Sequence, residues 1–211
     1  MFVCHSYNNT KNLDVLNNSK FVIIDQCSYN QQALLNIQNK DKTKVFLTVS
    51  RLVKEKNLDV VIKAFIQSSS INDILLVVGE GEDLIRLKEI AKENKNIKFI
   101  GFVPNNELVK YYDQADCFIV SHFDLETGPL TAIDAMAAGL IILSARTGAM
   151  SERLLDYNLW FSNDVDDLSD LIKKVKLMSE KEIVDLSTNI RSYYRQYNQE
   201  NIKNKYIELL K

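Results

Sequence analysis

The segment from Glu126 to Gly139, ETGPLTAIDAMAAG, combines residue types that suit phosphate binding. It follows an apolar run and a short loop, and Pro129 suits the first turn of a helix because proline lacks the N–H that would be unpaired there. The N–H groups of that turn would point back toward Glu126 and Gly128, where the positive end of the helix dipole also favours a phosphate. A buried helix after an ordinary loop is the alternative interpretation of this segment taken alone.

Two carboxylates lie in the same segment. Glu126 precedes the predicted helix, and Asp134 lies about one and a half turns into it among small and apolar neighbours. An acid in such surroundings needs a hydrogen-bond donor, and the paired hydroxyl groups of a ribose would serve. The alternatives are that Glu126 is a solvated loop residue and that Asp134 pairs with a structural Arg or Lys.

Two cations, Arg51 and Lys56, lie in the segment VSRLVKEKN at 49–57, between an apolar run and a predicted helix. Cations at the carboxyl end of a strand can neutralise a diphosphate without a metal ion. A basic loop residue is more often simply solvated, so this segment is weak evidence when it is taken alone.

The two histidines and one acidic pair suggest further chemistry that we discount. His122 lies four residues before Glu126, which invites a general-base role, but we interpret both His5 and His122 as surface or structural residues. Asp124 and Glu126 have the Asp-x-Glu spacing of a metal-binding pair. The predicted helix start and the two cations already provide for a diphosphate, so no metal site is predicted.

Apolar runs of strand length alternate along the chain with helical spacing. The runs are FVII at 21–24, VFLTV at 45–49, ILLVVG at 74–79, IKFIGF at 97–102, CFIV at 117–120 and LIILS at 140–144. They do not alternate with polar residues, as expected for parallel strands buried on both faces. The order predicts an α/β fold with one Rossmann-like, doubly wound parallel sheet, whose ligands bind beyond the carboxyl ends of the strands. After Phe161 only helical spacing continues, which predicts C-terminal helices.

Length and composition indicate one globular domain at residues 21–211, preceded by a poorly defined, linker-like segment at residues 1–20. The net charge of -2 argues against a nucleic-acid partner. Three cysteines without CxxC spacing predict neither disulfides nor a zinc site, and they fit a reducing cytoplasm. No apolar run approaches the roughly 18 residues of a membrane span, although peripheral contact with the inner face of a membrane is compatible with the sequence.

Five segments together resemble the C-terminal domain of family 4 glycosyltransferases, which have the GT-B architecture. They occur in the family's order and spacing and span most of the chain. They are SRLVKEKN, VVGEGEDLIRL, FIGFVPNNELVKYYDQAD, ETGPLTAIDAMAAGLIIL and TGAMSE. The resemblance implies a single nucleotide-sugar-binding domain over residues 21–211, with no metal and no cofactor, that takes a UDP-sugar or GDP-sugar as donor substrate.

The resemblance also implies roles for individual residues. Arg51 and Lys56 would hold the donor diphosphate and stabilise the departing nucleoside diphosphate. Asp134 would bind the ribose hydroxyls, and Glu126 would contact the transferred sugar, so that Glu126, Arg51 and Lys56 form the catalytic set. The remaining donor contacts would come from the base-binding main chain and from the loop at the helix start, namely Phe102, Val103, Thr127, Gly128, Pro129 and Leu130.

The chain departs from the family pattern at several positions. Asp134 stands where the family usually has Glu, Thr127-Gly128-Pro129 stand where Gly-Phe-Gly is commonest, and Ala149 replaces the second glycine of a later pair. The family's N-terminal domain, which binds the acceptor, has no counterpart before residue 1. The expected partners are therefore a glycan or lipid-linked acceptor and either an N-terminal acceptor-domain chain or a second copy of this chain.

Three functional hypotheses follow. The first is a retaining, metal-independent hexosyltransferase in surface polysaccharide or glycoconjugate synthesis, located in the cytoplasm or at the inner face of the membrane. The second is a non-catalytic nucleotide-sugar-binding or interaction subunit that needs a separate acceptor-domain partner. The third is an epimerase or phosphorylase that shares the GT-B architecture.

Overall fold

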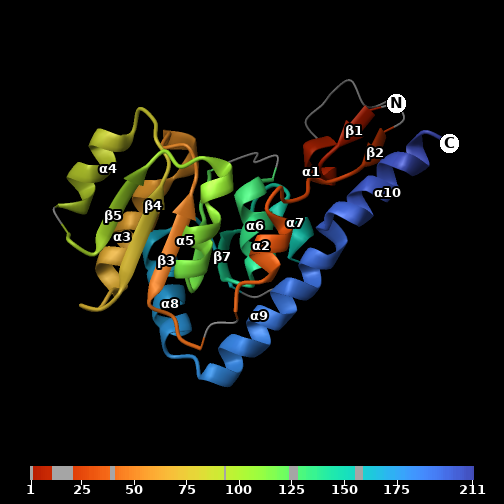
Figure 1. Ribbon diagram of the computed structural model, residues 1–211. Coiled ribbons are helices and arrows are strands. Elements are labelled where there is room, and N and C mark those ends of the chain that lie inside the picture. The colour runs from red at the N-terminus through yellow and green to blue at the C-terminus, as the bar shows by residue number, and fades with distance from the viewer. Residues whose placement is uncertain (1, 11–20, 39–40, 93, 124–127, 155–158) are drawn as a thin grey trace.

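Five of the predicted apolar runs form neighbouring strands of one sheet in the computed structural model of the chain (Figure 1). The structure describes residues 2–10, 21–38, 41–92, 94–123, 128–154 and 159–211. A sixth, two-residue strand that the sequence did not predict completes the sheet. The strands are β3 (Val45–Val49), β4 (Ile74–Val78), β5 (Ile97–Gly101), β6 (Cys117–Val120), β7 (Ile141–Ala145) and β8 (Trp160–Phe161).

The strand order of this sheet is β5-β4-β3-β6-β7-β8, and every neighbouring pair is parallel. This is the order of a doubly wound Rossmann-like sheet, in which the chain first builds one half from the centre outward and then returns to build the other. The direction of winding reverses between β3 and β6. The predicted fold class is confirmed, and its switch point is the crevice between β3 and β6.

Helices cover both faces of the sheet in two separate groups. On one face α3 packs against α8 and α4, and on the other α6 packs against α2, α5 and α9. The bounds are α2 (Gln31–Leu35), α3 (Leu58–Ser68), α4 (Leu84–Ala91), α5 (Val109–Gln114), α6 (Leu130–Ala138), α8 (Val165–Lys176) and α9 (Glu180–Tyr194). The sheet is therefore covered by helices on both sides, as its apolar strands require.

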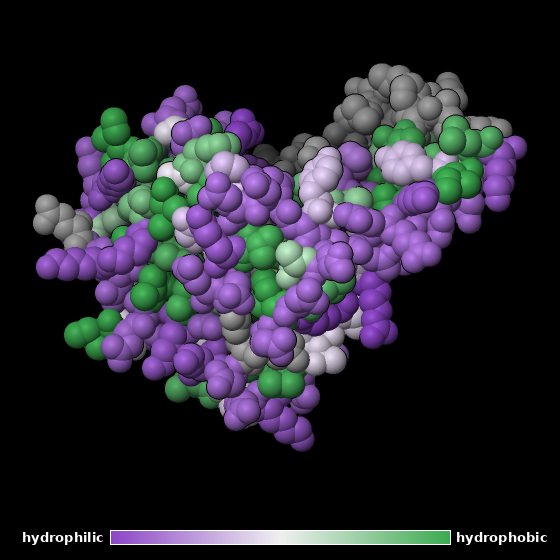
Figure 2. Space-filling model, viewed as in Figure 1, coloured by the Kyte–Doolittle hydropathy of each residue, from purple (hydrophilic) through white to green (hydrophobic). Residues whose placement is uncertain are grey.

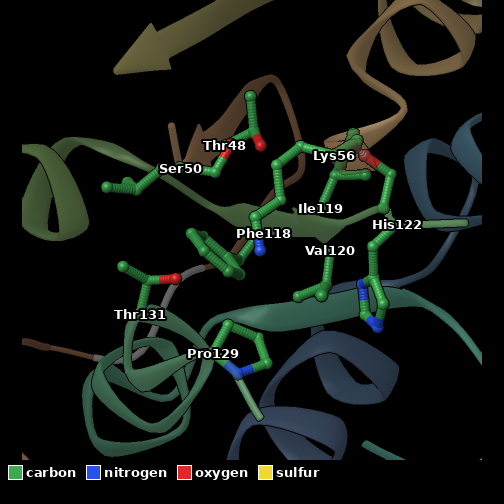
Figure 3. Close-up of a pocket in the computed structure, with 11 residues that line it drawn as sticks. Thr48, Ser50, Lys56, Phe118, Ile119, Val120, His122, Pro129 and Thr131 are labelled. Atoms are coloured by element: carbon green, nitrogen blue, oxygen red, sulfur yellow. Dashed lines mark hydrogen bonds between the residues drawn. The ribbon is translucent and has the colours of Figure 1, made fainter. Parts of the chain in front are cut away.

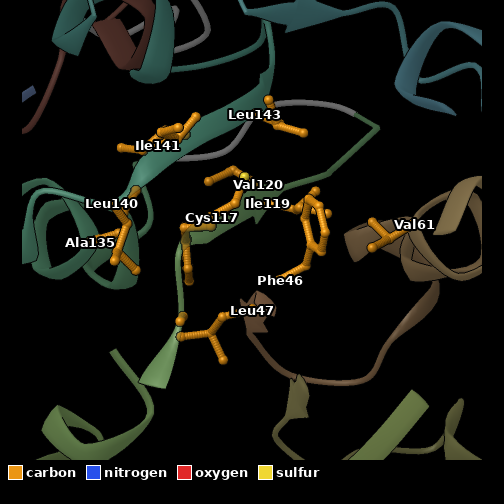
Figure 4. Close-up of a cluster of buried hydrophobic side chains, with 14 of the residues drawn as sticks. Phe46, Leu47, Val61, Cys117, Ile119, Val120, Ala135, Leu140, Ile141 and Leu143 are labelled. Atoms are coloured by element: carbon orange, nitrogen blue, oxygen red, sulfur yellow. The ribbon is translucent and has the colours of Figure 1, made fainter. Parts of the chain in front are cut away.

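The core lies along the central strands. All four residues of β6 are buried, and Phe46 of β3 contacts Phe65 of α3 edge to face, with ring centroids 5.8 Å apart. Figure 4 shows side chains from β3, β6 and β7 meeting those of α3 and α6. Each fully buried Leu, Ile, Val or Phe side chain in such a core contributes about 1.5–3 kcal/mol to stability relative to an exposed position. This core positions the strand ends where the predicted site lies.

A second, smaller sheet lies apart from the first. It pairs β1 (Phe2–Cys4) with β2 (Phe21–Ile23) in parallel, and α1 (Tyr7–Thr10) follows β1. The run FVII at 21–24 was expected in the main sheet, and that expectation was wrong: the apolar pattern of a strand does not say which sheet the strand joins. β1 and α1 also lie within residues 1–20, which were expected to be linker-like.

The C-terminal helices run from the main body to the small sheet (Figure 1). Ser179 and Glu182 form a capping box at the start of α9, whose end continues through η4 (Arg195–Tyr197) into α10 (Gln199–Leu209). In Figure 1, α10 lies beside β1 and β2. Among the helices that the structure describes, none is long and apolar enough to cross a bilayer.

Candidate functional site

The carboxyl ends of β3, β4 and β5 border a pocket of about 470 Å³. Its lining is mostly apolar and includes Phe102 and Val103, which follow β5, and Arg51, which follows β3. The side chain of Phe102 is 67% exposed, so its ring is available to a ligand. Gly79 at the end of β4 permits the close approach of the neighbouring strand, because a Cβ there would lie 1.8 Å from the carbonyl oxygen of Ser50. The pocket has the shape and chemistry to take a flat, partly apolar group.

A small cavity of about 20 Å³ continues from this pocket toward α6. Val49, Ser50 and Thr131 line both spaces, so the two belong to one site at the switch point. Figure 3 shows the side chain of Lys56 reaching across the end of β6 toward the side on which Pro129 and Thr131 lie. The predicted cation and the predicted helix start thus face each other across the crevice.

Lys56 is held by main-chain contacts with the loop after β6. It ends the short helix η2 (Lys54–Lys56), and the Ser121 hydroxyl donates a 2.7 Å hydrogen bond to the Lys56 carbonyl oxygen. The N–H of Phe123 donates to the carbonyl oxygen of Glu55 at 3.1 Å. These contacts fasten the loop after β3 to the loop after β6. The ammonium group is therefore carried by a fixed stretch of backbone.

A chain of two asparagines strengthens this attachment. Asn57 is buried with a φ of 52°, a left-handed conformation that asparagine tolerates better than most residues. Its side-chain amide donates to the Asn163 side-chain oxygen at 3.2 Å, and the Asn163 amide donates to the carbonyl oxygen of His122 at 2.8 Å. His122 is buried and lines the small cavity, so it is not a surface residue, and its structural role stays a prediction.

The start of α6 lies opposite Lys56. α6 begins at Leu130, and Pro129 is its N-cap with an extended ψ of 126°, so the helix starts one residue later than the sequence predicted. The carbonyl oxygen of Pro129 accepts a hydrogen bond from the N–H of Ala132 at 3.1 Å. Helix geometry leaves the N–H groups of Leu130 and Thr131 without a partner inside the helix. These donors and the helix dipole give the crevice a positive wall.

Two predicted residues of the loop before α6, Glu126 and Thr127, lie outside the described residues, as does Asp124. Their predicted contacts with the transferred sugar and the phosphate remain predictions. Gly128 is described and buried, with a φ of 107° that side chains rarely adopt. The loop thus enters α6 through a conformation that favours glycine.

Asp134 lies deeper than the other predicted residues. Asp134 is 2% exposed, and it lines neither the pocket nor the small cavity. Burial raises the pKa of its carboxyl group to about 6, and a hydrogen bond with Ser28 partly offsets this effect. The Oδ1 atom has no hydrogen-bond partner within the described part of the chain. The structure therefore does not bring Asp134 together with Arg51 and Lys56, and its ribose contact remains a prediction.

The structure adds a buried cation that the sequence did not single out. Arg153, at the end of α7 (Met150–Arg153), forms two hydrogen bonds with Asp25, from Nε at 2.8 Å and from Nη2 at 2.6 Å. A third guanidinium nitrogen donates to the carbonyl oxygen of Pro129 at 2.8 Å. No local pattern could have predicted this pair, because Asp25 and Arg153 are far apart in the sequence.

The sequence of the chain matches the family described as Glycosyl transferases group 1 over residues 30–197, which is most of its length. The chain belongs to this family. Its predicted strand ends, cations and helix start lie within the matched range. The resemblance stated from the five segments is confirmed at the level of this family.

This group 1 family member spans only part of the length of the following curated and solved relatives. It is 36% identical over 104 residues to the alpha-monoglucosyldiacylglycerol synthase of Acholeplasma laidlawii, a stretch that covers 47% of this chain and 26% of that protein. The solved sucrose-phosphate synthase from Thermosynechococcus elongatus matches with a TM-score of 0.78 and 19% identity, over 99% of this chain and 57% of that one. Anabaena Alr3699/HepE, solved in complex with UDP and glucose, matches with a TM-score of 0.78 and 16% identity. The match covers 99% of this chain and 62% of that one. These likenesses show a shared Rossmann-like fold.

Within the described residues, no three His, Cys, Asp or Glu side chains gather as a metal ion would require. The three cysteines are free thiols, of which Cys4 and Cys117 are buried. The expectation of a site that works without metal was not tested by this observation and remains a prediction.

Proposed function

We propose that the chain is the C-terminal, donor-binding domain of a family 4 glycosyltransferase. It would bind a UDP-sugar or GDP-sugar and transfer the hexose, with retention and without a metal, to a glycan or lipid-linked acceptor. The observation that carries the proposal is the crevice between β3 and β6, where Lys56 faces the start of α6 beside an apolar pocket. Membership of the group 1 family supports the same reaction class.

The apolar pocket would hold the nucleoside. Phe102 would contact one face of the base, and main chain near Val103 would meet its polar edge. Arg51 lines the same pocket, whereas Lys56 lines the adjoining small cavity. Asp134 is buried behind the site, so a ribose contact requires that the α6 segment open toward the pocket when the nucleotide binds.

The diphosphate would lie between Lys56, Arg51 and the first N–H groups of α6. When the bond between the anomeric carbon and the diphosphate oxygen breaks, negative charge develops on the leaving diphosphate. Two cations and a helix N-terminus stabilise this charge more in the transition state than in the bound donor. Glu126 would stabilise the positive charge that develops at the anomeric carbon of the sugar, consistent with its place in the sequence just before α6.

Acceptor binding would need a further surface. The chain spans only 26% of the curated relative and 57–62% of the two solved chains. We propose that a separate domain binds the acceptor. The small sheet exposes apolar side chains, with Val3 at 41% and Phe21 at 39% exposure, and Tyr7 of the adjoining α1 is 61% exposed. Figure 2 shows apolar side chains beside α10 on this extension. We infer that an acceptor-binding domain packs there.

Calorimetric titration of the chain with UDP, GDP and their sugars, in the presence of a chelator, tests the donor site. We expect binding to at least one nucleotide. Lys56→Ala should weaken it by about 1.5–3 kcal/mol, the usual contribution of a charge-assisted hydrogen bond. That is roughly 10- to 150-fold in dissociation constant.

Lys54→Ala is the matched control, because Lys54 lies on the same short helix with an exposed side chain and lines neither space. It should leave the affinity unchanged. If no nucleotide binds, the donor-site proposal is wrong. If Lys56→Ala binds as tightly as the unmodified chain, Lys56 does not contact the diphosphate.

A further inference from the structure

The guanidinium of Arg153 connects two parts of the molecule that are distant in sequence. Arg153 is 1% exposed, and its Cζ atom lies 5.9 Å from the centroid of the Tyr197 ring. Asp25 follows β2, so the ion pair ties α7 to the end of the small sheet. A buried, bidentate Arg–carboxylate pair holds both groups in one geometry, because either charge left alone in the core would be strongly destabilising.

The same guanidinium contacts the two residues before α6, Gly128 and Pro129. Nη1 of Arg153 donates to the carbonyl oxygen of Pro129 at 2.8 Å, and the N–H of Ala132 donates to that same oxygen at 3.1 Å. The guanidinium also packs on Gly128: a Cβ added there would lie 2.6 Å from Nη2 and 2.8 Å from Cζ. Arg153 therefore contacts the two residues that lead into the first turn of α6.

The neighbouring residue makes a parallel connection. The Glu152 carboxylate accepts a hydrogen bond from the N–H of Tyr7, the first residue of α1, at 2.9 Å. Two consecutive residues at the end of α7 thus contact the region of the small sheet: Glu152 contacts α1, and Arg153 contacts Asp25 after β2. From that anchor Arg153 reaches the wall of the crevice.

We propose that Arg153 is a positioning residue for the donor phosphates. It holds the Pro129 carbonyl oxygen and the backbone of Gly128 so that the first N–H groups of α6 face Lys56 across the crevice. Because Arg153 is paired with Asp25, which follows β2, this geometry depends on where the small β1–β2 sheet packs against the main body. The proposal rests on the proposed function, because it concerns the phosphates of the same donor.

A purely structural role and a positioning role predict different ligand dependence. If Arg153 positions the α6 start, its loss weakens binding of a nucleoside diphosphate but leaves binding of the nucleoside itself unchanged. If it only stabilises the fold, a folded variant binds both ligands as the unmodified chain does. The pair of ligands, UDP with uridine or GDP with guanosine, therefore separates the two roles.

Two variants test this difference. Arg153→Lys keeps the charge beside Asp25, but a single ammonium group lacks the planar fork that reaches Asp25 and the Pro129 oxygen together. The double variant Arg153→Met with Asp25→Leu replaces the buried charges by apolar groups, an exchange that buried pairs often tolerate. If Arg153→Lys does not fold, the double variant takes its place in the binding measurements. Thermal melting shows which variants are folded.

In a folded variant we expect the affinity for the diphosphate to fall at least tenfold and the affinity for the nucleoside to stay within twofold. Unchanged diphosphate affinity in a folded variant would overturn the positioning role. An equal loss for both ligands would overturn it too, because it would indicate general damage to the pocket. Failure of the unmodified chain to bind any nucleotide would instead refute the proposed function, so the two failures are distinguishable.

Discussion

The two sheets of this chain differ in how completely they are covered. The strands of the main sheet are flanked by helices on both faces, and its central strand β6 is buried throughout. The small sheet has two strands of three residues each and exposes Val3 and Phe21. A pair of short strands is only marginally stable by itself. The main sheet is thus covered on both faces, whereas the small sheet leaves apolar side chains exposed.

Polar contacts join the region of the small sheet to the main body. They include the Arg153–Asp25 pair and the hydrogen bond from the N–H of Tyr7 to the Glu152 carboxylate. Polar contacts of this type depend on geometry more than apolar packing does. The comparison shows that the crevice belongs to the main sheet, and that Arg153 links its wall to the end of β2.

The largest effect is expected in the core of the main sheet. Phe46→Ala removes a fully buried ring that packs on Phe65, and the loss of burial together with the cavity should cost about 3–5 kcal/mol. Urea denaturation followed by circular dichroism measures the free energy of unfolding. A cost below about 1 kcal/mol would contradict the picture of a tightly packed main sheet.

A smaller effect is expected at Asp134. Because burial raises its folded pKa to about 6 from 3.8, this group stabilises the fold below about pH 4, and its contribution is lost as the pH rises toward 6. The loss is on the order of 3 kcal/mol. Asp134→Asn should therefore flatten the decline of stability between pH 4 and 6 and stabilise the chain at pH 7. Denaturation at a series of pH values checks this, and an unchanged decline in the variant would refute it.

Next in size is the effect of the aromatic ring in the donor pocket. Phe102→Ala should weaken nucleotide binding by about 1–3 kcal/mol, the range for stacking of a base on an aromatic side chain. Its ring is exposed, so the free energy of unfolding should change little. Ile85→Ala, an exposed apolar residue on α4 outside the pocket, serves as control and should leave binding unchanged. Equal affinities for the Phe102 variant and the control would exclude a base at this ring.

The smallest effect is expected in the small sheet. Val3→Ala trims a side chain that is already 41% exposed, and surface changes of this kind usually stay within about 0.5 kcal/mol. The same denaturation experiment as for Phe46→Ala gives the direct contrast between the two sheets. A cost similar to that of Phe46→Ala would show that the small sheet is as well packed as the main one.

The sequence by itself determined the elements whose patterns are local. Five strands of the main sheet lie within a residue of the predicted runs, because a strand buried on both faces needs an uninterrupted apolar run. The position of Lys56 beyond β3 and the start of a helix near Pro129 followed in the same way. Since parallel strands end at one edge of a sheet, the order of elements already indicated that these groups share a crevice.

Tertiary structure decided what depends on partners far along the chain. The run at 21–24 resembles a central strand, yet it pairs with β1 in a separate sheet, and the two-residue strand β8 exists only because β7 offers it an edge. Asp134 needed a donor by its local surroundings, but only packing showed that it faces Ser28 and lies behind the pocket. Arg153 finds Asp25 and the Pro129 oxygen across the fold. Pairing of strands and of charges is fixed by three-dimensional proximity, which residue types and spacing do not encode locally.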